Sequence, residues 1–297
     1  MSTNSIPDIL WHYCSPETFE LILANKSIRL SDITNCLDKL EIRYAKRKYR
    51  LLLNKDVRSI IKKYPKRSQK WFEAFSGKRI LRKLSSKHIC FVFCLSERDD
   101  IEGHWNIHAC EKTGVSVGFN LNALVNNVSK IELLTSKVFY KNNLIKSIYK
   151  KKNASFHKIL SDTFDKYTEI ARNLKKTTRM SDRDLFELSN ECYSRVIDLL
   201  LPDFASFKRH KFEWEQEWRL LLTSTNVKKS FAAKNIYLQK KDCFKCWWYV
   251  SFDLIDAIKA ITIGEESKLT VDYVKNFLKT KCSLTPEEIK NITIKKL

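Results

Sequence analysis

Apolar and polar positions along the chain predict strands near both ends and helices between them. Residues 89–96 form an unbroken apolar run, which is typical of a strand buried on both faces of a sheet. Between residues 213 and 222, polar and bulky side chains alternate with a period of two, which predicts another strand. Shorter segments of strand character lie at residues 9–13, 27–31, 114–119, 130–140, 247–252 and 258–263. A single sheet would therefore be assembled from distant parts of the chain.

Helical periodicity fills the spaces between these strands. Residues 15–17 (Ser-Pro-Glu) form a typical helix start, with a capping side chain, a proline at the first position and an acid in the first turn. Residues 143–200 keep apolar side chains at a 3.6-residue spacing, and Pro202 is the expected stop. A last helix is expected over about residues 268–280.

The predicted fold class is α+β, with a mixed central β-sheet and helices inserted between its strands. We expect one domain over residues 1–297, with helical insertions at about 41–87 and 143–200. A hydrophobic fraction of 43% is enough for a real core. No run of 18 apolar residues suggests a membrane span, and residues 1–7 lack the pattern of a signal peptide, so the expected location is the cytoplasm.

The nine cysteines are scattered along the chain and are expected to be reduced in that compartment. Cys243 and Cys246 form a Cys-x-x-Cys pair, but zinc would need two further ligands at a similar spacing, and none is obvious. We therefore expect no metal site.

Positive charge is concentrated in one segment. The chain carries a net charge of +21, and residues 41–87 hold seventeen lysines and arginines against three acids. Aromatic residues (Trp71, Phe72 and Phe75) follow the basic helical pattern, a combination that would suit a phosphate backbone. It would equally suit a solvated helix face over a core. A nucleic-acid partner through residues 43–87 is one prediction, and a protein partner at an exposed patch around Trp247 and Trp248 is another.

Three carboxylates are the main candidates for chemistry. Glu213, Glu215 and Glu217 would share one face of the strand predicted at residues 213–222, where they would repel one another. A site that stabilises positive charge would use such an arrangement. An exposed edge strand with solvated charges is the alternative.

Several segments, in this order, resemble a bacterial family known as domain of unknown function 2971. They are Trp11-His12-Tyr13-Cys14-Ser15, Ile28-Arg29-Leu30-Ser31, the acids Asp38 and Glu41, Phe93-Cys94-Leu95-Ser96-Glu97, Trp105, Gly114-Val115-Ser116-Val117-Gly118-Phe119, Glu215-Gln216-Glu217-Trp218-Arg219-Leu220 and Ile261-Thr262-Ile263-Gly264. Leu37 departs from the pattern, since the family usually has Asn before the acid. The ordered set spans nearly the whole chain.

That family looks related to the ADP-ribosyltransferase superfamily, whose members split NAD at the nicotinamide–ribose bond. The resemblance implies an ADP-ribosyltransferase-like fold, with His12 on the first strand, Ser96 on a middle strand and Glu215-Gln216-Glu217 on a later one. The His-Tyr start is similar to toxins that modify DNA. The implied enzyme is therefore an NAD-dependent ADP-ribosyltransferase, as a bacterial toxin or an anti-phage defence effector.

The resemblance implies a role for each candidate residue. Glu217 would stabilise the oxocarbenium-like state, and Glu215 would orient the acceptor or take its proton. His12 would bind a ribose hydroxyl or the nicotinamide amide, and Ser96 would hold the carboxylate of Glu217. The remaining cofactor contacts would come from Arg29 or Arg219 on the pyrophosphate and from an aromatic ring on nicotinamide, Trp105 or Tyr140 rather than Tyr13.

Each of these residues has a structural alternative. His12 would be a satisfied strand histidine, Ser96 a cap of the loop after its strand, Trp105 a core residue and Arg219 a partner of Glu215 or Glu217. The function also has alternatives: an NAD glycohydrolase with the same site, or a non-catalytic nucleic-acid-binding module that kept the fold.

Overall fold

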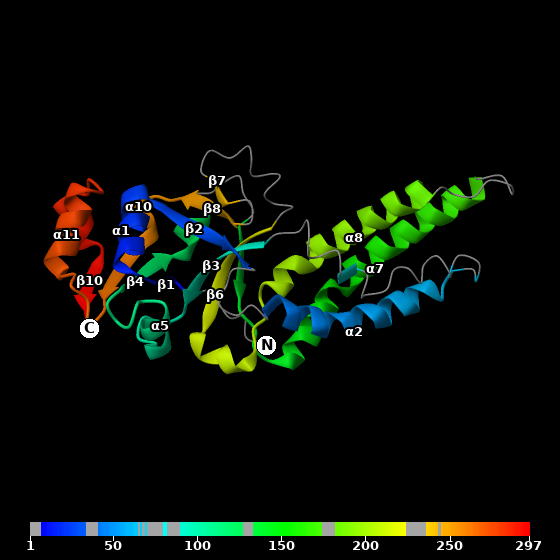
Figure 1. Ribbon diagram of the computed structural model, residues 1–297, viewed down its shortest axis with the longest axis horizontal. Helices are drawn as coiled ribbons and strands as arrows, with labels where there is room; N and C mark the ends of the chain where they lie inside the picture. Colours follow the sequence, from blue (N-terminus) through cyan, green and yellow to red (C-terminus); the bar gives the residue numbers. More distant parts are fainter. Residues whose placement is uncertain are drawn as a thin grey trace.

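The computed structural model describes residues 7–33, 41–64, 66, 69, 80–81, 90–126, 133–173, 182–223, 236–242 and 245–297 (Figure 1). The strands are β1 (Ile9–Cys14), β2 (Ser27–Asp32), β3 (Cys90–Ser96), β4 (Val115–Asn120), β5 (Leu134–Lys137), β6 (Glu217–Thr223), β7 (Ile236–Asp242), β8 (Lys245–Ser251), β9 (Ile258–Ile263) and β10 (Thr293–Lys296). The helices are α1 (Pro16–Asn25), α2 (Glu41–Ile61), α5 (Glu102–Ile107), α6 (Leu121–Asn126), α7 (Asn142–Asn173), α8 (Asp182–Phe204), the 3-10 helix η3 (His210–Glu215), α10 (Leu254–Ala257), α11 (Val271–Thr280) and α12 (Pro286–Lys290).

The expected α+β class is confirmed by a mixed sheet that contains all ten described strands. Its order is β10-β9-β4-β1-β3-β2-β8-β7, with β6 paired to β3 and β5 paired to β6. The pairing of β9 with β10 is parallel, and the other ladders are antiparallel. The sheet joins segments from both ends of the sequence, as the strand pattern indicated.

The sheet divides at β3. One edge of β3 pairs with β6 along its whole length, from Cys90 opposite Thr223 to Ser96 opposite Glu217. The other edge is shared, because β2 pairs with Phe91 and Val92 whereas β1 reaches β3 only at Ser96. Residues 93–95 lie between these two pairings, so β1 and β2 separate there. The divergence of two strands beside a third creates space for a cavity.

Strand β3 is apolar from Cys90 to Leu95 because each of its faces covers a different core. Phe91, Phe93 and Leu95 belong to a core with α1, α6, α10 and α11, whereas Cys90 and Val92 belong to a second core with α2, α7 and α8. Successive side chains of a strand point to opposite faces, so a strand between two cores has no polar face.

Helices α2, α7 and α8 form a unit that we call the helical arm, and in Figure 1 they extend together away from the sheet. Helix α2 runs parallel to α7, since Tyr49 contacts Tyr149 near one end and Tyr64 bonds to Ser161 and Asp165 near the other. The arm contains one helix within the insertion expected at 41–87, where most residues beyond 64 are outside the described part, and two helices over the insertion expected at 143–200. None of the described helices is long and apolar enough to cross a membrane.

Local signals predicted most element starts correctly. The Ser15 side chain caps α1 by accepting from the backbone N–H of Thr18 at 3.2 Å. Two details were wrong. Pro202 lies inside α8, which continues to Phe204. Of the strand expected at residues 130–140, the described part is 133–140, and within it β5 covers Leu134–Lys137. Strands β7 and β10 and helix α12 were not predicted. Trp71, Phe72, Phe75 and Cys243, and the side chains of Cys246, Trp247 and Trp248, lie outside the described part.

Candidate active site

A cavity of about 570 Å³ lies where β1 and β2 separate beside β3. Its volume falls within the roughly 300–1,000 Å³ typical of small-molecule sites. Helices α1 and α5 and the segment that contains η3 complete its walls. The lining residues are Trp11, His12, Tyr13, Thr18, Ile22, Arg29, Ser31, Val92, Phe93, Cys94, Leu95, Ser96, His104, Ile107, His108, Lys208, Arg209, Lys211, Phe212, Glu215, Glu217 and Arg219. Seven of the nine predicted site residues are therefore brought together: His12, Tyr13, Arg29, Ser96, Glu215, Glu217 and Arg219.

Glu215 and Glu217 reach this cavity from two different elements, not from one strand face. Residues 210–215 form η3, and β6 starts only at Glu217. Gln216 joins them in the left-handed region, with φ at 46°. The prediction that three carboxylates share one strand face was therefore wrong, because a strand cannot include a left-handed residue without changing direction. Glu213 accordingly points elsewhere and pairs with Lys141 at 3.5 Å.

The C-terminal end of η3 is held in place by two hydrogen bonds to one backbone carbonyl. The Glu215 carbonyl accepts from Ser96 Oγ at 3.0 Å and from His104 Nε2 at 2.9 Å. Ser96 therefore positions the backbone of Glu215, whereas we predicted that it would hold the carboxylate of Glu217. The turn is anchored to β3 and α5, which orients both carboxylates toward the cavity.

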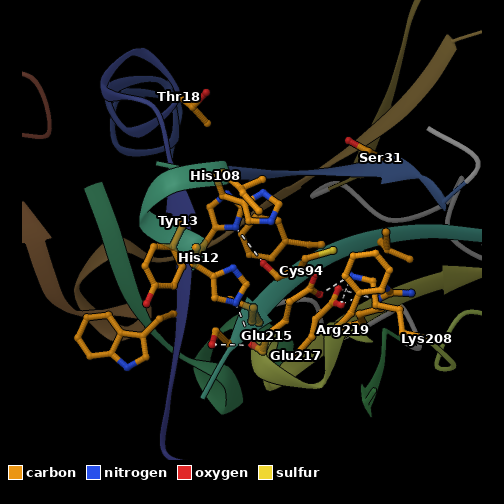
Figure 2. A pocket seen from close by; sticks show the side chains of 18 of the residues that line it. His12, Tyr13, Thr18, Ser31, Cys94, His108, Lys208, Glu215, Glu217 and Arg219 are labelled. Carbon is orange, nitrogen blue, oxygen red and sulfur yellow. Dashed lines mark hydrogen bonds and ion pairs between the residues drawn. The ribbon is translucent and has the colours of Figure 1, made fainter. Parts of the chain in front are cut away.

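Two cations neutralise the two carboxylates (Figure 2). Arg219 is fully buried and binds Glu217 through Nε at 2.7 Å and Nη2 at 3.1 Å, while its Nη1 donates to the Ala205 carbonyl. Lys208 Nζ bonds to Glu217 at 2.8 Å and also contacts Glu215. Arg219 is thus a structural partner of Glu217, which was the alternative to its predicted role on the pyrophosphate. Lys208 joins both carboxylates in one ionic cluster.

The environments push the pKa values of the two carboxyl groups in opposite directions. Burial would raise the pKa of Glu217, but Arg219 and Lys208 outweigh it and hold the pKa well below the usual range. Burial raises the pKa of Glu215, and the charge of Glu217 adds to that effect against Lys208. Glu217 is therefore ionised near neutral pH, whereas Glu215 takes up and releases a proton more readily.

His12 offers a hydrogen-bond acceptor to the cavity. Its Nδ1 lies 2.9 Å from the Cys94 carbonyl on the separated edge of β3, so this nitrogen carries the proton and donates. The ring stacks on Phe93 with centroids 4.2 Å apart. Burial lowers the pKa of His12 to about 4 despite the backbone hydrogen bond. The imidazole is neutral near pH 7, and its Nε2 is left as the acceptor.

Of the predicted aromatic contacts, Trp105 and Tyr140 lie behind the cavity wall, whereas Tyr13 lines the cavity. Trp105 is 2% exposed, donates to the Asp99 carbonyl and packs against Tyr13, and it does not line the described cavity. Tyr140 is also buried, and its hydroxyl accepts from the backbone N–H of Glu217 at 3.1 Å. Tyr13 donates to the Arg98 carbonyl at 2.7 Å and stacks on His104. These three aromatics support the site rather than present a free stacking face.

Several site residues were not predicted from the sequence. Lys208, Arg209, Lys211 and Phe212 come from one short basic and aromatic segment that leads into η3 and includes its first turn. With Arg29 of β2, the basic residues give the cavity a cationic side. The Phe212 ring lies 4.8 Å from Lys211 Nζ and 5.4 Å from Lys208 Nζ. His104 and His108 come from α5 and its end, and burial lowers the pKa of His108 to about 4. In the sequence, the only signal for the residues at 208–212 was that basic and aromatic side chains gather next to Glu213–Glu217.

No group of three His, Cys, Asp or Glu side chains within the described ranges is arranged to hold a metal ion.

Comparison with known proteins gives one family match. Residues 104–220 match the model of a family described as a protein of unknown function, DUF2971. No curated protein and no solved structure matches the chain. The matched segment contains His104, Lys208, Glu215, Glu217 and Arg219, and it supports the resemblance to that family. An ADP-ribosyltransferase-like fold stays a prediction.

Proposed function

We propose that this chain is an ADP-ribosyltransferase-like enzyme that breaks the bond between nicotinamide and ribose in NAD and transfers ADP-ribose to an acceptor. The observation that carries the proposal is the buried carboxylate of Glu217. It is 2% exposed, is kept ionised by Arg219 and Lys208, and faces a cavity with a cationic side and aromatic walls. NAD would match each of these features. Its phosphates are negative, its rings are flat, and its ribose develops positive charge during bond cleavage.

The chemistry follows from the charge distribution. Nicotinamide is a cation in NAD, so the bond from its ring nitrogen to ribose C1′ breaks with the electron pair returning to the ring, and no acid is required. Positive charge then grows on the ribose, as it does in glycoside hydrolysis. An ionised carboxylate in a site with little water stabilises this charge more strongly than it would in solution. Glu217 has this role in the proposal.

The second carboxylate would serve the acceptor. As the acceptor oxygen or nitrogen bonds to C1′, its proton passes to Glu215, whose raised pKa suits a group that both takes and releases a proton. The same step with water as acceptor would give an NAD glycohydrolase. Glu215 and Glu217 contact the same ammonium group, which places them close enough to act on one sugar.

The cavity walls would bind the rest of the substrate. Arg29, Arg209 and Lys211 are the groups that suit the pyrophosphate. His12 Nε2 would accept from a ribose hydroxyl or from the nicotinamide amide. Lys208 bonds to Glu217, and phosphate oxygens of a substrate would compete for that ammonium group.

The first test is release of nicotinamide by the wild type and by Glu217→Gln. Each protein is incubated with NAD alone and with NAD plus DNA, RNA or cell lysate, and free nicotinamide is measured by chromatography. Loss of the carboxylate should slow release by roughly 10²–10³-fold, a typical cost of removing one such electrostatic group. ADP-ribose found on the acceptor identifies a transferase, whereas free ADP-ribose identifies a glycohydrolase.

Glu213→Gln is the matched control, because Glu213 belongs to the same short segment but pairs with Lys141 outside the cavity. It should leave release unchanged. Melting temperatures show whether each variant is folded. The proposal fails if the wild type releases no nicotinamide under any of these conditions, or if folded Glu217→Gln releases it as fast as the wild type.

A further inference from the structure

One face of α2 carries a continuous row of cations. Its other face is apolar and packs on α7 and α8 through Ala45, Tyr49, Leu53, Val57 and Ile60. That packing turns the basic residues outward. Exposed cations on this face and the turn that follows are Arg43, Arg47, Arg50, Lys55, Arg58, Lys62 and Lys63.

Between Arg43 and Lys63, where the side chains are described, the sequence contains one acid. Asp56 is the acid between Arg43 and Lys63, and it is turned inward, where it accepts from Tyr149 and lies 3.7 Å from His157. Within the described ranges, none of the seven cations forms an ion pair. Like charges three or four residues apart destabilise a helix by a few tenths of a kcal/mol per pair. A bound polyanion would relieve this repulsion.

The row of cations on α2 begins at the end of the helical arm that lies nearest the candidate active site. Lys141, which directly precedes α7, pairs with Glu213 of η3, and Lys208 bonds through its backbone N–H to the Phe139 carbonyl. Since α2 runs parallel to α7, its first turns lie at this same end. In Figure 1 both helices start near β6 and extend away from the sheet. Lys146 and Lys150, in the first nine residues of α7, are also exposed.

We propose that the outer face of α2 binds the phosphate backbone of double-stranded nucleic acid. A helix of 21 residues is about 30 Å long, which corresponds to roughly nine base pairs of a duplex. Exposed side chains of this face are basic or small and polar, apart from Leu51, and include no aromatic ring. Proteins that bind single strands without sequence preference stack bases on aromatic side chains, so the face fits a duplex better.

If the proposed function also holds, the bound duplex is the acceptor of ADP-ribose; this second step depends on that function, whereas binding does not. The arm would hold the duplex with one end directed toward Glu215. Phosphate contacts fix register and orientation without reading sequence, so binding should be independent of sequence.

The test is fluorescence anisotropy with a labelled 20-base-pair DNA or RNA duplex at several salt concentrations. All variants are made in the Glu217→Gln background, so that no transfer occurs. One variant combines Arg43→Gln, Arg47→Gln, Arg50→Gln and Arg58→Gln. Its matched control combines Lys275→Gln, Lys279→Gln, Lys281→Gln and Lys290→Gln, which removes the same charge from exposed residues of α11, its C-cap and α12 at the far end of the molecule.

The α2 variant should lose at least tenfold in affinity, and its slope of log K against log salt should flatten by about 0.9 for each phosphate contact removed. The control variant should bind nearly as the parent does. Equal losses in both variants would overturn the proposal, because only net charge would then matter. Absence of duplex binding by the parent, tighter binding of single strands, or binding of phosphatidylserine vesicles in place of duplex would also overturn it.

The two proposals fail separately. Duplex binding with no nicotinamide release by the wild type supports the surface and rejects the enzyme. Release without duplex binding does the reverse. Circular dichroism of the α2 variant shows whether the helix remains, and glutamine is nearly as good a helix former as arginine.

Discussion

At the scale of single residues, the site depends on how one lysine and one arginine are shared between two carboxylates. Arg219 binds Glu217 through two nitrogens, and Lys208 contacts Glu217 and Glu215 together. Pairs of acids whose pKa values are pushed apart are a common basis for dividing catalytic roles. Here the ionised member is the more deeply buried one, because it has both cations.

This division predicts a pH dependence for transfer to the acceptor. Burial raises the pKa of Glu215 to about 7, so its carboxylate form increases as the pH rises through that value. Transfer requires the carboxylate as proton acceptor and should therefore rise between about pH 6 and 8. The measurement is kcat/KM against pH for the wild type and Glu215→Gln, at constant ionic strength.

Glu215→Gln should transfer slowly at every pH and lose the rise. The stability of the wild type should change in the opposite sense to its activity. The folded chain holds this proton more tightly than the unfolded chain, so the contribution of Glu215 to the free energy of unfolding falls as pH increases from about 4.5 to 7. A pH profile that is the same in both proteins would remove Glu215 from the mechanism.

At the scale of elements, the junction of η3 and β6 decides which acids reach the cavity. Gln216 adopts a left-handed conformation, and its carbonyl accepts from the backbone N–H of Glu97 at 3.2 Å. Within η3, Glu213 and Glu215 point in different directions because two residues are about two thirds of a 3-10 turn, and the turn at Gln216 then brings Glu217 to the cavity beside Glu215. Sequence spacing alone would have placed them together.

Substitution of Gln216 should test this junction. Gln216→Val should lower the free energy of unfolding by roughly 1–2 kcal/mol, since the left-handed region is costly for residues with a Cβ and most costly for branched ones. Gln216→Gly should change it by about 1 kcal/mol or less, in the stabilising direction. Urea unfolding of both variants is the measurement. A larger loss for glycine than for valine would contradict the assigned backbone conformation.

At the scale of the whole molecule, two hydrophobic cores share the same strands. Leu220 and Leu222 of β6 belong to the core with α1 and α11, whereas Leu221 belongs to the core with the helical arm. All three are fully buried. Unfolding of either core would therefore disrupt β6, which both cores share. The helical arm packs on the sheet through the second of these cores.

This arrangement predicts cooperative unfolding. Leu220→Ala and Leu221→Ala should each lower the free energy of unfolding by about 2–5 kcal/mol, the usual cost of such a truncation in a core. Far-UV circular dichroism reports mainly the long helices of the arm, and tryptophan fluorescence reports mainly the sheet. In each variant the two transitions should coincide. Separate transitions would mean that the two cores unfold independently.

The sequence by itself determined most of the elements, because their signals are local or periodic. The cap at Ser15, the apolar run that became β3 and the 3.6-residue spacing of α7 and α8 were sufficient for helices and strands, and the family motifs indicated His12, Arg29, Ser96, Glu215 and Glu217 as one site. None of these required knowledge of distant contacts.

Only the tertiary structure decided how these residues act. Arg219 binds Glu217 rather than a ligand, Tyr140 and Trp105 are buried behind the wall, and Lys208 enters the site from a segment with no motif. The turn at Gln216 interrupts an alternation that looked like a strand. These outcomes depend on which distant groups pack together, and on the pKa values and backbone angles that such packing imposes, which a linear pattern does not contain.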